Sequence, residues 1–149
     1  MGNITRITKE EIFMKSALLW AERGTCLRAK VGCIITMQDR IISTGYVGSK
    51  PGESHCLDEG CIIDPKTGGC IRTIHAERNA IDFAKENIKN SILECKLYVT
   101  ISPCLDFAEY IVDTHIDHVI YLIKYRDTGP LDYLKECGVK VSQYKGRTA

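Results

Sequence analysis

The sequence predicts an α/β fold in which a mixed sheet of about five strands lies between helices on both of its faces. Two β-rich runs joined by a short polar turn come early in the chain, and strand and helix patterns alternate in its second half. Such an alternation calls for a sheet that is covered by helices. The chain has 149 residues, a length typical of one domain with its own core. We therefore expect a single domain over residues 1–149.

The first third of the chain predicts a helix followed by a β-hairpin. Thr8 and Glu11 have the spacing of a capping box, and apolar residues recur behind them at helical spacing. Two β-rich runs with a polar pair between them come next, and this pattern is typical of a hairpin. We expect the helix over about 9–23 and the hairpin strands over 31–37 and 40–46.

The segment from 47 to 73 is expected to be mostly irregular. It holds five glycines, two prolines and three cysteines, and this density of turn residues excludes regular structure over most of its length. A loop this long inside a compact domain is usually functional or held in place by something. The elements expected after it are a helix over 75–89, a strand over 97–101, a helix from Pro103 at its first position to about 113, a strand over 118–123, a helix over 130–136 ended by Gly138, and a strand over 139–144.

Composition and charge limit the classes of function. Apolar residues make up 44 % of the chain and charged residues 26 %, which excludes a disordered or repetitive protein. Twenty Lys and Arg against nineteen Asp and Glu give a net charge of +1, too little to attract a polynucleotide or an anionic membrane. No apolar run reaches the ~18–20 residues of a transmembrane helix, and no signal-peptide pattern opens the chain. We expect a soluble, cytoplasmic protein whose ligand is a small molecule.

The chain contains eight cysteines. In a reducing compartment cysteines serve as metal ligands, reactive thiols or buried apolar thiols more often than as disulfides. Cys33 and Cys95 fall in predicted strands and are expected to be buried, and Cys137 is expected to pack beside a helix. A further group lies in the long irregular segment, where it could hold a structural zinc ion or consist of scattered thiols and a surface histidine. Its members are His55, Cys56, Cys61 and Cys70.

Two triplets stand where predicted helices begin. His75-Ala76-Glu77 opens one helix and Ser102-Pro103-Cys104 precedes the next. A zinc ion held there by an imidazole and thiolates would gain from the helix N-termini, whose partial positive charge favours thiolate over thiol. A carboxylate two residues past the histidine could take a proton from a metal-bound water, whose pKa is lowered towards ~7. The chemistry that results is hydrolytic attack at an amidine-like carbon.

These triplets belong to a longer pattern that extends over nearly the whole chain. Its stretches are Thr25–Gly32, Arg40–Tyr46, Cys70–Ile81, Leu97–Thr100 and Ser102–Cys104. Together they resemble the deoxycytidylate (dCMP) deaminase family, among zinc deaminases that carry H-x-E and P-C-x-x-C motifs. The resemblance implies a three-layer α/β/α cytidine-deaminase-like fold and hydrolysis of the amidine C–N bond of dCMP, giving dUMP and ammonia. It assigns His75 and Cys104 as zinc ligands, Glu77 as the catalytic proton shuttle and the Ser102 carbonyl as a neighbour of the exocyclic amine.

The resemblance also implies partners other than the substrate dCMP. It suggests a homohexamer that is activated by dCTP with magnesium and inhibited by dTTP. Guanidinium and ammonium groups near the pocket are candidates for the nucleotide phosphates. The candidate substrate- or effector-binding residues are Arg28, Lys30, Gly45, Tyr46, Val47, Ser102, Tyr125 and Arg126.

Two positions depart from the family pattern. Phe107 stands three residues after Cys104, where the family has its second thiolate, and a phenylalanine cannot bind zinc. Val47 replaces an asparagine that is expected to bind the nucleotide's sugar, which removes a hydrogen bond worth ~0.5–1.5 kcal/mol. The remaining donors, His75 and Cys104, are one fewer than the three protein ligands that a catalytic zinc normally has.

Three interpretations of these departures remain open. In the first, the chain deaminates dCMP, and its site is completed by a thiol from the 47–73 segment or by a different metal coordination. In the second, it keeps the fold and the nucleotide pocket but acts as a binding or regulatory protein without activity. In the third, the sequence carries a substitution relative to an active parent.

Overall fold

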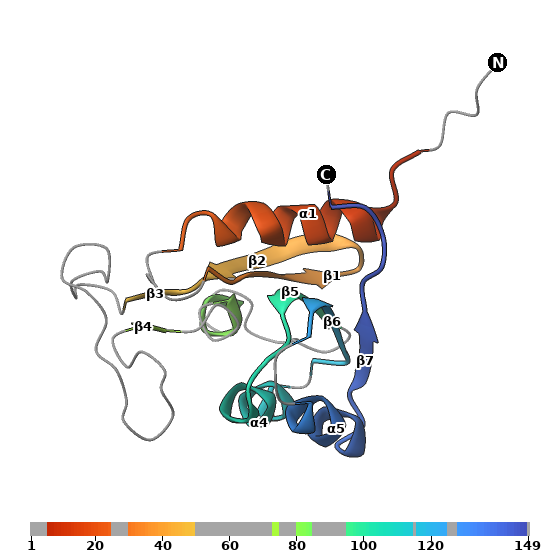
Figure 1. The fold of residues 1–149 in the computed structure, drawn as a ribbon. Coiled ribbons are helices and arrows are strands. Elements are labelled where there is room, and N and C mark those ends of the chain that lie inside the picture. Colours follow the sequence, from red (N-terminus) through yellow and green to blue (C-terminus); the bar gives the residue numbers. More distant parts are fainter. Residues whose placement is uncertain are drawn as a thin grey trace.

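The computed structural model describes residues 6–24, 30–49, 73–74, 80–84, 95–114, 116–124 and 128–148. Their centre is a five-stranded sheet in the order β2-β1-β5-β6-β7. Figure 1 shows α1 along one face of this sheet and α4 and α5 along the other. The elements are α1 (Lys9–Ala21), β1 (Gly32–Met37), β2 (Arg40–Tyr46), β3 (Gly48–Ser49), β4 (Thr73–Ile74), β5 (Cys95–Ile101), α4 (Leu105–Asp113), β6 (His118–Ile123), α5 (Gly129–Glu136) and β7 (Lys140–Gln143), with residues 80–84 also helical.

The sheet is mixed, as the sequence predicts. β1 runs antiparallel to both β2 and β5, whereas β5, β6 and β7 are parallel to one another. Gln38 and Asp39 form the turn between β1 and β2 with φ values of 53° and 60°, the left-handed conformation that a tight hairpin turn requires. The parallel strands are joined through α4 and α5, which confirms the predicted alternation.

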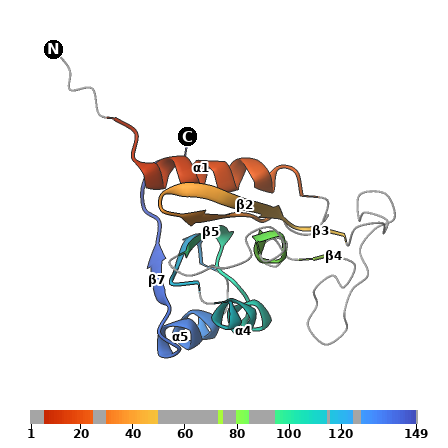
Figure 2. The same cartoon turned by 180° about the vertical axis from the view of Figure 1, so that it is seen from behind.

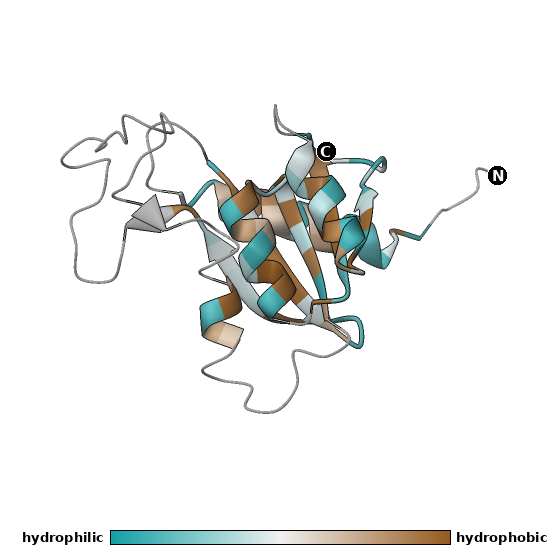
Figure 3. Cartoon of the chain, turned by 90° about the horizontal axis from the view of Figure 1, so that it is seen from below, coloured by the Kyte–Doolittle hydropathy of each residue, from teal (hydrophilic) through white to brown (hydrophobic). Residues whose placement is uncertain are grey.

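Side chains alternate between the two faces of the sheet. On one face Ile34, Tyr98 and Ile120 are buried against Phe13 and Met14 of α1. The neighbouring residues in the same strands belong to a larger apolar cluster on the other face, under the helices 80–84, α4 and α5. Figure 3 shows that the helices on this side carry both hydrophobic and hydrophilic residues. The predicted layering of helices on both faces is therefore confirmed. The strand members of the larger cluster include Cys33, Ile35, Leu97, Val99, Val119 and Tyr121.

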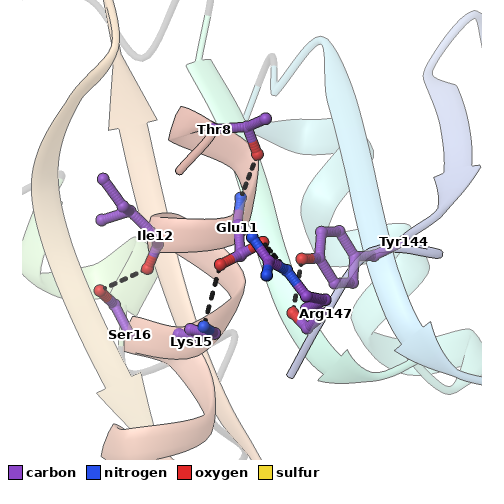
Figure 4. A network of polar contacts seen from close by, with 7 residues as sticks. All are labelled: Thr8, Glu11, Ile12, Lys15, Ser16, Tyr144 and Arg147. Carbon is purple, nitrogen blue, oxygen red and sulfur yellow. Dashed lines mark hydrogen bonds and ion pairs between the residues drawn. The ribbon is translucent and has the colours of Figure 1, made fainter. Parts of the chain in front are cut away.

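Thr8 caps α1, but only half of the predicted capping box forms. The Glu11 N–H donates to Thr8 Oγ1 at 3.1 Å, whereas the Glu11 carboxylate accepts from Lys15 Nζ at 2.9 Å and from Arg147 Nε at 3.2 Å (Figure 4). The Tyr144 hydroxyl donates to the Arg147 carbonyl at 2.7 Å. The hydrogen bond from Lys15 and the ion pair with Arg147 lower the pKa of Glu11. The start of α1 is thus tied to the end of the chain.

The helix α4 begins two residues later than the sequence predicts. Cys104 is its N-cap, with φ −77° and ψ 174°, and Pro103 lies outside the helix. The expectation that Pro103 is the first helical residue is therefore wrong. The reason is that the Ser102 N–H donates to the Ile123 carbonyl at 2.9 Å, which keeps the chain alongside β6 past the end of β5.

The end of α5 follows the prediction. Gly138 has φ 87°, and its N–H and that of Val139 donate to the carbonyls of Lys135 and Leu134 at 3.0 Å and 2.9 Å. This pair of hydrogen bonds is the Schellman pattern, in which glycine is favoured because it has no Cβ.

The predictions for the cysteines in strands are confirmed, and the prediction for Cys137 is wrong. Cys33 and Cys95 are fully buried, as predicted, and burial raises the pKa of the Cys95 thiol. Cys137 is exposed, so the prediction that it packs beside a helix is wrong, because it is the C-cap of α5 and has already left the buried face. Within the described part of the chain, no helix is long and apolar enough to cross a membrane.

Candidate active site

The strands β2 and β5 end at the same edge of the sheet. β1 is antiparallel to both, and Cys33 pairs with Gly45 on one side and with Val99 on the other. Val47 and Ser102, which follow these two strands, therefore lie at a common edge. The carboxyl ends of parallel strands are where ligands bind in open α/β sheets.

A second, two-stranded sheet places the H-x-E motif near this edge. β3 pairs with β4 through Gly48–Ile74 and Ser49–Thr73. Figure 2 shows the two short strands side by side beyond the end of β2. Because β3 directly follows Val47 and β4 directly precedes His75, this pairing brings the two predicted pocket segments together.

The helical residues 80–84, which follow the H-x-E motif, are fixed from two sides. The Ser43 hydroxyl of β2 donates to the Ala80 carbonyl at 2.6 Å, and both residues are buried. On the other side the Tyr110 hydroxyl of α4 donates to the Asp82 carboxylate. His75-Ala76-Glu77 lies outside the described residues, but the segments that precede and follow it are attached to β3, β2 and α4.

Cys104 occupies the position that the sequence predicts for it, at a helix start. Its carbonyl accepts from the Ala108 N–H at 2.9 Å, which closes the first turn of α4. The residue is partly exposed, whereas Ser102 is buried. Phe107 is the third residue of α4 and is also partly buried. The described part of this site therefore contributes one thiol.

A close contact between α1 and β1 shapes the other side of the edge. A Cβ on Gly32 would lie 2.1 Å from the Ala17 carbonyl oxygen and 2.5 Å from the Ala21 nitrogen, so only glycine lets the helix come this near. Gly32 pairs with Tyr46. The ring of Trp20, in the last turn of α1, stacks on the Tyr46 ring with centroids 6.1 Å apart and planes 1° apart.

Val47 and Lys30 lie beside this contact. The Val47 N–H donates to the Val31 carbonyl at 3.0 Å, and the residue is only 6 % exposed, as a member of the larger apolar cluster. Lys30 is exposed where the chain enters β1. Its ammonium group is therefore accessible to an anion at this edge.

The structure brings several predicted site residues to one edge of the sheet. They are Lys30, Gly45, Tyr46, Val47, Ser102, Cys104 and Phe107. Other predicted site residues lie outside the described residues and stay predictions, namely the catalytic Glu77, the metal ligand His75, the binding residues Arg28, Tyr125 and Arg126, and the loop cluster His55, Cys56, Cys61 and Cys70. Among the residues described, no group of three or more His, Cys, Asp or Glu side chains could hold a metal ion.

Sequence reasoning missed the residues that position the site. Ser43 and Tyr110 were not singled out, because a serine in a strand and a tyrosine in a helix are common at any surface. Trp20 fits the apolar pattern of α1, which gives it no other role. Its stacking partner Tyr46 is 26 positions away in the chain, so no local pattern could pair them.

Two residues of β5 and β6 whose pKa values are shifted lie away from the candidate site. His118 is the first residue of β6, and its Nε2 lies 2.8 Å from the Ser142 hydroxyl oxygen. Burial lowers the pKa of His118, and the neighbouring Lys140 and Lys96 lower it further. Burial also raises the pKa of Tyr98, in the middle of β5, to about 12.

The fold and the motif residues agree with a known class of zinc enzymes. The model of the family described as "Cytidine and deoxycytidylate deaminase zinc-binding region" matches residues 7–123. The chain therefore belongs to the cytidine and deoxycytidylate deaminase family.

Similar proteins include several that are named as deoxycytidylate deaminases. The chain is 39 % identical over 142 residues to ComE operon protein 2 of Bacillus subtilis, covering 93 % of this chain and 72 % of that protein. It is 30 % identical over 171 residues to the deoxycytidylate deaminase of Enterobacteria phage T4, covering 89 % and 88 %. The match to the deoxycytidylate deaminase of Saccharomyces cerevisiae is 32 % identical and covers 97 % of this chain, which spans only 47 % of the yeast protein.

Solved structures support the same fold. The dCMP deaminase of cyanophage S-TIM5, in a complex with dCMP and dUMP, has a TM-score of 0.80 at 28 % identity, covering 95 % of this chain and 100 % of that one. A diaminohydroxyphosphoribosylaminopyrimidine deaminase/5-amino-6-(5-phosphoribosylamino)uracil reductase from Thermotoga maritima has a TM-score of 0.67 at 23 % identity. The match covers 91 % of this chain and 36 % of that one, and it shows the fold alone. The three-layer α/β fold that the sequence predicts is thus confirmed.

Proposed function

We propose that this chain hydrolyses dCMP to dUMP and ammonia at the edge formed by the ends of β2 and β5. One observation carries the proposal. The β3–β4 pairing and the hydrogen bonds of residues 80–84 attach both flanks of the H-x-E motif to elements of that edge, where Cys104 opens α4. The family match and the relatives named as deoxycytidylate deaminases support the substrate.

Each predicted residue has a role that suits its chemistry. Glu77 moves one proton from the attacking water to the cytosine ring, and then a second proton from the newly formed C4 hydroxyl to the departing ammonia. The Ser102 carbonyl accepts a hydrogen bond from the exocyclic amine, and the Ser102 N–H donates to the Ile123 carbonyl of β6. The phosphate is held by the cations Lys30, Arg28 and Arg126 together with Tyr125.

The donor set for zinc is one member short. His75 and Cys104 are the donors that the two motifs supply, and zinc bound there would lower the pKa of a water towards ~7. The residue at position 107 is a phenylalanine, so α4 adds no second ligand. A catalytic zinc normally has three protein ligands. A structural zinc on the loop cluster His55, Cys56, Cys61 and Cys70 remains a separate proposal.

The proposal is tested by turnover. Purified protein is incubated with dCMP, zinc, dCTP and magnesium, and the release of ammonia and dUMP is measured. We expect the two products in equal amounts, and we expect the Glu77→Gln variant to release them about 10²–10⁴-fold more slowly. Absence of both products from the unaltered chain contradicts the enzymatic proposal.

A second function is favoured by a specific observation. Phe107 offers no ligand, and Val47 is buried with the apolar core, where it has no polar group for a sugar. These substitutions suit a deaminase-like protein that binds nucleotides without converting them. Calorimetric binding of dCMP with no product formed over a long incubation would support this function over the first.

The assembly and its effectors belong to the same proposal. We propose a homohexamer that dCTP with magnesium activates and dTTP inhibits, with residues 1–149 acting as a single domain. Light scattering of the protein with and without dCTP tests the assembly. A mass equal to one chain under both conditions contradicts it.

A further inference from the structure

The residue three positions after a helix N-cap lies beside the N-cap side chain. This neighbourhood is the one that a capping box uses, in which the N-cap side chain reaches the third helical residue. Cys104 is the N-cap of α4, so Leu105, Asp106 and Phe107 are its first three helical residues. Phe107 is therefore the residue of α4 that stands next to the Cys104 thiol.

Neither neighbour of Phe107 can supply the zinc ligand that Phe107 lacks. Asp106 is exposed and lies two residues from Cys104, which corresponds to a rotation of roughly 200° about the helix axis. Ala108 is fully buried and has no donor atom. The first turn of α4 is closed by the hydrogen bond between the Ala108 N–H and the Cys104 carbonyl, which fixes these directions.

We infer that α4 offers a zinc ion one thiolate, that of Cys104, and that the single substitution Phe107→Cys converts it into a two-thiolate site. The inference rests on the proposed function, because that function places the metal at this end of α4. It concerns the metal alone, so it can fail while deamination stands, and the reverse also holds.

The expected difference in zinc affinity is large. Loss of a residue that only hydrogen-bonds to a zinc ligand lowers the zinc affinity by about 10–100-fold. Loss of a ligand itself lowers the zinc affinity further. We therefore expect Phe107→Cys to bind zinc at least about 100-fold more tightly than the unaltered chain, as measured by competition with a chromophoric chelator. The matched control is Phe107→Leu, which keeps an apolar residue and gains no ligand.

Cobalt substitution counts the thiolates without any substrate. The charge-transfer band from thiolate to cobalt grows with the number of Co–S bonds. The Cys104→Ser variant that keeps Phe107 has no thiolate at this site, so subtracting its band from that of each protein removes the contribution of the loop cysteines. We expect the band that remains to be about twice as intense in Phe107→Cys as in the unaltered chain, because two thiolates replace one. Phe107→Leu should match the unaltered chain.

Two results would overturn the inference. One is an unaltered chain whose Cys104-dependent band already has the intensity of two thiolates, which would mean that another cysteine completes the site. The other is a folded Phe107→Cys variant with no gain in band or zinc affinity. If that variant does not fold by circular dichroism, the band of the unaltered chain decides, since one thiolate supports the inference and two refute it.

Discussion

The two ends of the parallel strands β5 and β6 differ in what their polar groups do. At the starts, His118 contacts Ser142 of β7 and Cys95 is fully buried. At the ends, Ser102 and Cys104 lead into α4, and Cys104 is partly exposed at a helix start. The contact of His118 at the starts joins two neighbouring strands. At the ends the Ser102 N–H also bonds to Ile123 of β6, but Cys104 is presented to a shared edge. We expect substitutions at the starts to change stability and those at the ends to change chemistry.

The largest expected effect is the loss of turnover in Glu77→Gln, which we compare with the loss of stability in Glu11→Gln. Glu77→Gln, at the chemical end, should lower the turnover number by about 10²–10⁴-fold, because a proton shuttle contributes that much. Glu11→Gln removes the ion pairs with Lys15 and Arg147 and should lower the melting temperature while the turnover number stays the same. Turnover assays and thermal unfolding of both variants check this contrast, and a large loss of turnover in Glu11→Gln would break it.

A smaller effect is expected at the contact between α1 and β1. Gly32→Ala places a Cβ against the backbone of Ala17 and Ala21, so the helix must shift, at a cost of about 1–3 kcal/mol in the free energy of unfolding. Because Trp20 of that helix stacks on Tyr46, the KM for dCMP should rise as well. Urea unfolding and steady-state kinetics measure the two changes. An unchanged KM in a destabilised variant would show that this contact does not position the pocket.

Gly138→Ala is the matched variant before β7. Gly138 has φ 87° and nothing lies within 4 Å of an added Cβ, so the cost comes from the left-handed backbone alone, about 1–2 kcal/mol. We expect lower stability in urea and no change in KM. A rise in KM as large as that of Gly32→Ala would mean that both ends respond alike.

The smallest expected effect is a dependence of stability on pH. Burial lowers the pKa of His118 below its unfolded value of 6.5, Lys140 and Lys96 add to the shift, and Glu10 opposes it. The unfolded chain therefore binds the proton first, so the contribution of His118 is complete above pH 6.5 and is lost as the pH falls towards the lowered pKa. Urea midpoints between about pH 7.5 and pH 5.5 should fall less in His118→Gln than in the unaltered chain. An equal fall of the urea midpoint with pH in the two proteins would refute the assignment of this pH dependence to His118.

Local signals account for most of what the sequence predicts correctly. The hairpin turn at Gln38 and Asp39 and the end of α5 at Gly138 depend on residues within a few positions of one another. Apolar periodicity gives the helices and strands. The start of α4 was missed because its position depends on the Ser102 bond to Ile123 of β6, which is a tertiary contact.

The candidate site divides in the same way. Cys104 at a helix start could be read from its triplet, and the absence of a ligand at Phe107 could be read from the spacing. The attachment of residues 80–84 to Ser43 and Tyr110 could not be read from the sequence. Ser43 is 37 positions from its partner Ala80, and Tyr110 is 28 positions from its partner Asp82.

The sequence by itself determined the family, the elements and the order of the chemical groups, because motifs and caps act over a few residues. Only the tertiary structure decided which segments meet. The pairing of β3 with β4 and the ion pair between Glu11 and Arg147, 136 positions apart, join parts of the chain that carry no mark of each other. Such contacts form when layers pack around a shared core, and that packing places the end of β2, the start of α4 and the flanks of the H-x-E motif at one edge.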